Sequence, residues 1–159
     1  MATLDDIIEN GTLELFEVPD WQSRLPIHRL YVATELIEWI DAKKELHSKR
    51  FAQGGRTLFE HLEHTFCDFR CSERPPAGDL RRMTPNNQGI WKMHPVGLRI
   101  YGWCPAHCTF VAVTAALEME TKKDKRLNNK KLDEVKKFIE KHDVEQTVVM
   151  GDILAIFPI

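Results

Sequence analysis

Residues 89–123 constrain the fold of this chain most strongly, because they contain three short strand-like runs in close succession. The runs are residues 90–93, 98–101 and 110–113, and in the first two Lys92, Arg99 and Tyr101 alternate with apolar residues. Alternation with a period of two is typical of strands that bury one face. The segment therefore predicts consecutive antiparallel strands of one sheet.

This alternation also predicts what one face of the sheet carries. Successive strand side chains point to opposite faces, so Arg99 and Tyr101 share one face while Leu98 and Ile100 point toward the core. Lys92 occupies the same kind of position in the preceding strand. If the two strands are neighbours, one surface collects two cations and a tyrosine, a combination that could hold an anion beside a proton donor.

The charge of the chain is −2 overall, but it is unevenly distributed. Residues 1–69 carry a net charge of −6, residues 70–131 carry +7 and residues 132–159 carry −3. The overall charge argues against a wholly basic nucleic-acid binder, whereas the excess of cations in the central segment indicates a binding site for a polyanion there. The acidic flanks are then either solvated or face a basic partner.

Two helices are expected before the strands. The segment of residues 13–18 is short, rich in apolar residues and followed by Pro19, which favours a first strand. An apolar stripe over residues 27–40 predicts a helix that starts after Pro26, and a second stripe over residues 58–66 predicts another.

The remaining segments extend this order. Residues 71–88 are rich in proline, glycine and asparagine and predict an exposed connection with a short strand near Leu80. Asn129 is a candidate cap for a further helix with an apolar stripe over residues 132–139. Residues 147–157 predict a strand or hairpin.

The four cysteines form two pairs of equal spacing, Cys67 with Cys71 and Cys104 with Cys108, and His107 lies inside the second pair. Structural zinc sites commonly use two to four intervening residues, so a zinc site is arithmetically allowed. The spacing is also compatible with reduced thiols, and Cys104 and Cys108 could flank a hairpin loop. Reduced thiols are the preferred interpretation and zinc the alternative.

No apolar run approaches the roughly 20 residues needed to cross a bilayer, and the first residues are acidic. We therefore expect a soluble cytoplasmic protein with no membrane partner. The length of 159 residues suits a single domain, residues 1–159, with a short N-terminal extension and an apolar C-terminal tail.

The order strand, helix, helix, three antiparallel strands, helix resembles the RelE/HigB-like toxins of type II toxin–antitoxin systems, in particular those of phage origin. The resemblance covers about residues 12–142 and is carried by residues 90–92, 98–101 and 110–113, and by Lys122 and Lys123 before the closing helix. It implies a RelE-like α+β fold, here with an extra C-terminal strand or hairpin.

The resemblance further implies a hydrolase-class endoribonuclease that cleaves messenger RNA, often on the ribosome, by metal-independent attack of a 2′-hydroxyl on the adjacent phosphate. No cofactor is implied, and the partners are mRNA and a cognate antitoxin. Arg99 and Lys92 match the family's strand cations, while Tyr101 and His94 are proposed for proton transfer from their chemistry. The predicted RNA-binding residues are Arg81, Arg82, Lys122, Lys123, Lys125 and Arg126.

Two other functions stay open. The same scaffold could belong to a non-catalytic phage or prophage protein that binds nucleic acid or protein, and the cysteine pairs could build a zinc-stabilised binding module. Individual residues also have plainer interpretations: Arg99 could pair with Glu118 or Glu120, and His94 could simply lie in a turn.

Overall fold

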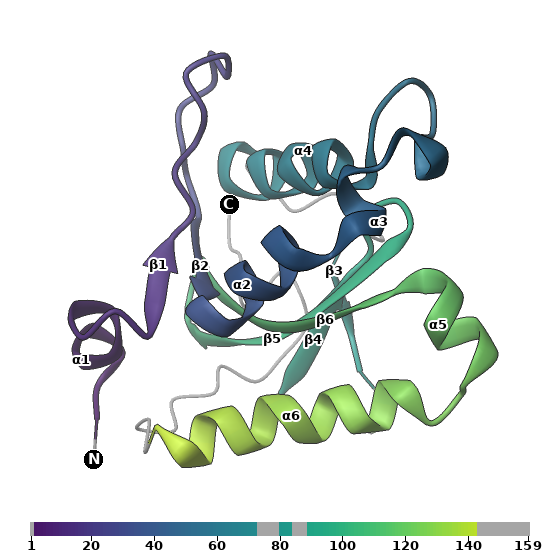
Figure 1. Ribbon diagram of the computed structural model, residues 1–159. Helices are drawn as coiled ribbons and strands as arrows, with labels where there is room; N and C mark the ends of the chain where they lie inside the picture. Colours follow the sequence, from purple (N-terminus) through teal and green to yellow (C-terminus); the bar gives the residue numbers. More distant parts are fainter. Residues whose placement is uncertain (1, 73–79, 84–88, 143–159) are drawn as a thin grey trace.

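The computed structural model describes residues 2–72, 80–83 and 89–142, whose strands form one six-stranded sheet (Figure 1). The strands are β1 (Leu13–Leu15), β2 (Arg29–Ala33), β3 (Leu80–Arg82), β4 (Ile90–Met93), β5 (Leu98–Ala106) and β6 (Thr109–Leu117). The helices are α1 (Leu4–Glu9), α2 (Thr34–Ala42), α3 (Lys44–His47), α4 (Leu58–Cys71), α5 (Glu118–Lys123) and α6 (Leu127–Lys141), with a 3-10 turn η1 (Lys49–Phe51). The predicted α+β class is confirmed for the described residues.

The sheet has the strand order β1-β2-β6-β5-β4-β3. All neighbouring strands are antiparallel except β2 and β6, which run parallel. Parallel neighbours need a long connection, and here the chain between β2 and β6 includes α2 and α4. The predicted antiparallel neighbours β4, β5 and β6 are confirmed, and the short strand expected near Leu80 is β3.

Different helices cover the two faces of the sheet. Trp103 of β5 pairs with Val111 of β6, and its ring lies 6.0 Å from that of Phe138 in α6. Phe110, the preceding residue of β6, points to the opposite face, where its ring lies 6.0 Å from that of Phe69 in α4. In Figure 1, α4 accordingly lies above the strands and α6 below them.

Two of the helices form where a cap or an apolar stripe was visible in the sequence. α4 begins after Thr57, whose hydroxyl accepts a hydrogen bond from the backbone N–H of Glu60, and it buries Leu62 and Phe66. The predicted stripe of α6 is also buried, and it consists of Leu132, Val135, Phe138 and Ile139.

The helix predicted over residues 27–40 is wrong in its first part. Residues 29–33 form β2, and α2 begins only at Thr34. Leu30 pairs with Phe110 of β6 and is fully buried. The apolar residues of this segment are therefore buried by neighbouring strands, and this tertiary pairing outweighs the helical spacing seen in the sequence.

Three boundaries also differ from the prediction. α6 begins at Leu127, so Asn129 lies inside the helix, and the capping residue Arg126 forms no side-chain cap hydrogen bond. Lys122 and Lys123 belong to the last turn of α5. The first strand is limited to residues 13–15. The strand or hairpin predicted at residues 147–157 lies outside the described residues.

Candidate functional site

Three cations lie on one face of adjacent strands. In the strand register Arg81 of β3 is opposite Lys92 of β4, and Lys92 is opposite Tyr101 of β5. Arg99 precedes Tyr101 by two residues and therefore points to the same face. We call the surface formed by Arg81, Lys92 and Arg99 the cationic face. The register thus groups Lys92, Arg99 and Tyr101 as their alternation predicts, and adds Arg81.

The charged side chains of the cationic face influence one another. Burial lowers the pKa of Lys92, and the charges of Arg99 and Arg81 lower this pKa further. Burial also lowers the pKa of the neighbouring His94 to about 4, with additional contributions from Arg99, Lys92 and Arg81. His94 is therefore neutral at pH 7, and its buried Nε2 has no hydrogen-bond partner among the described residues.

Arg99 is oriented by its own strand and by α5. Its side chain is 17% exposed, its Nη1 donates to the Leu98 carbonyl at 2.6 Å, and its Nη2 lies 3.2 Å from Glu118 Oε1. Lys122 Nζ lies 2.9 Å from the same carboxylate oxygen. The hydrogen bond from Lys122 and the charge of Arg99 hold the pKa of Glu118 below its usual value. The pairing with Glu118, one of the plainer interpretations of Arg99, is therefore confirmed.

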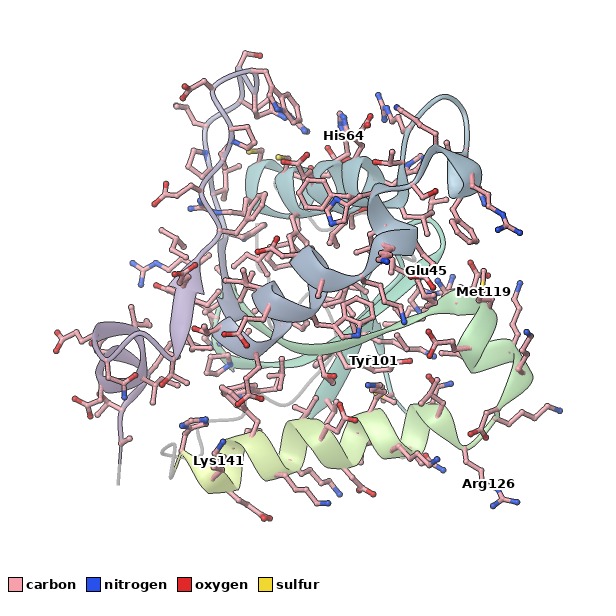
Figure 2. All side chains as sticks on the ribbon, viewed as in Figure 1. Glu45, His64, Tyr101, Met119, Arg126 and Lys141 are labelled. Carbon is pink, nitrogen blue, oxygen red and sulfur yellow. The ribbon has the colours of Figure 1, made fainter. Side chains whose placement is uncertain are left out.

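Tyr101 has a different environment from the cations beside it. The residue is fully buried between the sheet and α6 (Figure 2). Its hydroxyl donates a 2.6 Å hydrogen bond to Asn128 Oδ1. Burial raises the pKa of Tyr101 to about 12. This phenol joins the sheet to the first turn of α6, and the geometry does not fit the exposed proton-transfer group that the sequence predicts.

Asn128 is a residue that sequence reasoning missed. The sequence predicts its neighbour Asn129 as a helix cap and predicts no role for Asn128. Only the packing of α6 against β5 indicates that Asn128 accepts the Tyr101 hydrogen bond.

The other predicted RNA-binding residues are more dispersed. Lys122 lies at the edge of the cationic face, where it forms an ion pair with Glu118, the carboxylate that also pairs with Arg99. Lys123 and Lys125 are exposed at and beyond the end of α5, and Arg126 projects from the turn before α6, away from Tyr101 (Figure 2). The side chain of Arg82 lies outside the described part of the structure.

The four cysteines are free thiols. Cys67 and Cys71 lie on α4 and Cys104 on β5, and burial raises the pKa of Cys67 to about 11 and that of Cys104 higher still. Within residues 2–72, 80–83 and 89–142, no three His, Cys, Asp or Glu side chains are grouped so that they could hold a metal ion. The zinc alternative on Cys67, Cys71, Cys104 and Cys108 therefore finds no support in the described residues.

In comparisons with known proteins, no family model, no curated protein and no solved structure matches this chain. Among the described helices, none has the combination of length and apolar character that a membrane crossing requires.

Proposed function

We propose that the protein is a RelE-like endoribonuclease toxin that acts in the cytoplasm on messenger RNA. The observation that carries this proposal is the register that puts Arg81, Lys92 and Arg99 on one face of β3, β4 and β5. Cations on adjacent strands can contact a phosphodiester and stabilise the negative charge that develops during cleavage. A cognate antitoxin that covers the cationic face would then neutralise the enzyme.

The proposed mechanism uses the protein's own side chains without a metal. The 2′-hydroxyl attacks the adjacent phosphorus, the bond from phosphorus to the 5′-oxygen of the next nucleotide breaks, this oxygen takes a proton from water, and a 2′,3′-cyclic phosphate forms. Arg99 and Arg81 stabilise the charge on the phosphate oxygens. Lys92 accepts the hydroxyl proton, because its lowered pKa makes the neutral amine more accessible than in an ordinary lysine.

Cleavage of a fluorescent single-stranded RNA by the purified protein tests this function. We expect Arg99→Ala to reduce cleavage by at least about a hundredfold, whereas the matched variant Arg29→Ala stays within about twofold of wild type because Arg29 is an exposed residue of β2, outside the cationic face. We expect Lys92→Arg to bind RNA normally and to lose cleavage, since arginine keeps the charge but does not accept a proton. Cleavage by Lys92→Arg at the wild-type rate would exclude Lys92 as the base.

A non-catalytic RNA-binding protein on the same scaffold is the second candidate. It is favoured by the burial of Tyr101 and by the neutral state of the half-buried His94, which leave Lys92 as the one predicted catalytic group beside the phosphate site that could accept a proton. Salt-dependent RNA binding without cleavage, together with normal growth when the wild-type chain is expressed, would favour this candidate. Growth arrest that disappears with Arg99→Ala would favour the toxin.

A further inference from the structure

A concave surface of a different kind lies between α2 and α4, beside β1. It has a volume of about 280 Å³ and its lining is mainly apolar. Ile37 and Ile40 of α2 form one wall and Phe59 of α4 contributes to the other, while Phe16 and Phe66 meet edge to face with their ring centroids 5.2 Å apart. Leu15 on the adjoining edge strand is 36% exposed.

Carboxylates from three elements surround this apolar lining. Glu14 comes from β1, Glu17 from the segment after it, Asp41 from α2 and Glu63 from α4. We call this surface the acidic groove. No described residue that lines it is basic, and none of the four carboxylates forms an ion pair within the described part of the chain.

The larger cavity between α2 and α6 differs in this respect. It has a volume of about 440 Å³, but its charges are largely paired internally. Lys131 Nζ lies 3.2 Å from Glu134 Oε2, and Lys141 Nζ lies 3.5 Å from Glu35 Oε1. The acidic groove therefore combines an open apolar lining with carboxylates that lack internal counter-ions, and the larger cavity does not.

We propose that the acidic groove binds a segment of a partner protein in which aliphatic side chains are flanked by lysine or arginine. The aliphatic side chains would cover Ile37, Ile40 and Phe59, and the cations would reach the carboxylates at the rim. RNA is disfavoured at this surface because its phosphates would meet four carboxylates. The four carboxylates of the groove are among the acidic residues that give residues 1–69 their net charge of −6.

The inference is independent of RNA cleavage, because the groove shares no residue with the cationic face. Burial and the charge of Glu60 raise the pKa of Glu63, while nearby His64 lowers it. A bound lysine or arginine would favour the ionised form of Glu63 and so add to the attraction at neutral pH.

A short synthetic amphipathic peptide of leucine and lysine is the probe for this site. Its affinity for the full chain can be measured by calorimetry, and its position by amide chemical shifts. We expect the triple variant Glu14→Gln, Glu17→Gln, Asp41→Asn to weaken binding at least about tenfold. The control variant carries the same charge change at exposed positions outside the groove, Glu9→Gln, Glu38→Gln and Glu140→Gln, and should weaken binding less than about threefold.

Two matched peptides complete the test. Replacing lysine by glutamate, or leucine by serine, should each weaken binding at least about tenfold, because the site needs both charge and apolar contact. Chemical-shift changes should concentrate at Ile37, Ile40 and Phe59. Equal losses in the groove and control variants, equal binding of the serine peptide, or shifts spread over other surfaces would overturn the proposal.

Discussion

At the residue scale, the central contact of the cationic face is the one between Arg99 and Glu118. The carboxylate lies 3.2 Å from Arg99 and 2.9 Å from Lys122, so it partly neutralises two cations near the surface where a phosphate would bind. Arg99 is mostly buried and directed by the Leu98 carbonyl, and its position therefore does not depend on Glu118 alone. Glu118 is expected to compete with phosphate for the guanidinium group.

The substitution Glu118→Gln tests this competition. We expect the variant to bind single-stranded RNA about three- to tenfold more tightly at low salt, because one negative charge beside the phosphate site is removed. The matched variant Glu120→Gln changes the neighbouring charge without touching Arg99 and should have a smaller effect. Fluorescence anisotropy over a salt series measures both, and equal effects of the two variants would contradict a specific role for Glu118.

Tyr101 is expected to stabilise the fold and not to act in catalysis. The substitution Tyr101→Phe removes the hydrogen bond to Asn128 Oδ1, and we expect the free energy of unfolding to fall by about 1–2 kcal/mol. RNA binding and cleavage should stay within about twofold of wild type. Urea denaturation of Tyr101→Phe, Asn128→Ala and the double variant gives the coupling energy of the pair. Lost cleavage with unchanged stability would instead assign Tyr101 to the reaction.

At the scale of elements, the contact between β5 and β6 is unusually close at Gly102. The register of the two strands shifts between Tyr101 and Gly102, and Gly102 pairs with Ala112. A Cβ atom added at Gly102 would lie 1.8 Å from the Val111 carbonyl oxygen and 2.9 Å from the Phe110 ring. Only glycine permits this close approach of the two strands. Arg99 and Tyr101 precede Gly102 in the same strand, β5.

The substitution Gly102→Ala should therefore disturb both stability and site geometry. We expect the free energy of unfolding to fall by about 3 kcal/mol or more, because backbone atoms of β6 have to move. Gly54→Ala is the comparison, since a Cβ atom there has open space and only the φ of +58° is unfavourable, which costs about 1 kcal/mol. Urea denaturation of both variants compares the cost of the close contact at Gly102 with the cost of the positive φ at Gly54. Equal decreases in the free energy of unfolding would show that β6 moves away from an added Cβ atom at little cost.

At the scale of the whole molecule, opposite charges are separated onto different surfaces. The cationic face lies on β3, β4 and β5, and the acidic groove lies on β1, α2 and α4. The low overall charge of −2 therefore conceals two surfaces of opposite sign. Burial of His94, together with the nearby cations, also makes the folded state sensitive to pH, because protonated His94 would add a further positive charge.

The stability of the protein should decrease between about pH 6.5 and pH 4 because of His94. Its pKa is about 4 in the folded state and about 6.5 when unfolded, so in this range the unfolded chain binds more protons and acid favours unfolding. The ring is only half-buried, and we therefore expect a contribution on the order of 1 kcal/mol.

Urea denaturation at pH 7 and at pH 4.5 measures this effect. His94→Gln should lose less stability on acidification than wild type, whereas His107→Gln, in the exposed turn between β5 and β6, should behave as wild type does. An identical acid response in wild type and His94→Gln would contradict the assignment.

Local patterns in the sequence predicted the antiparallel strands β4, β5 and β6, the short strand β3, and the buried stripes of α4 and α6. The alternation of residues 98–101 also predicted that Arg99 and Tyr101 share a face. These features follow from the period of side-chain directions along a strand or helix, which depends only on neighbours in the chain.

Tertiary structure alone decided the other features. Residues 29–33 became β2 because β1 and β6 lie on either side of them, although their spacing is helical. Arg81 belongs to the cationic face because β3 pairs with β4 and places it opposite Lys92. Tyr101 lies between the sheet and α6, where it donates a hydrogen bond to Asn128. Such outcomes depend on contacts between residues far apart in the chain, and the periodicity of a single segment carries no information about which partner will cover it.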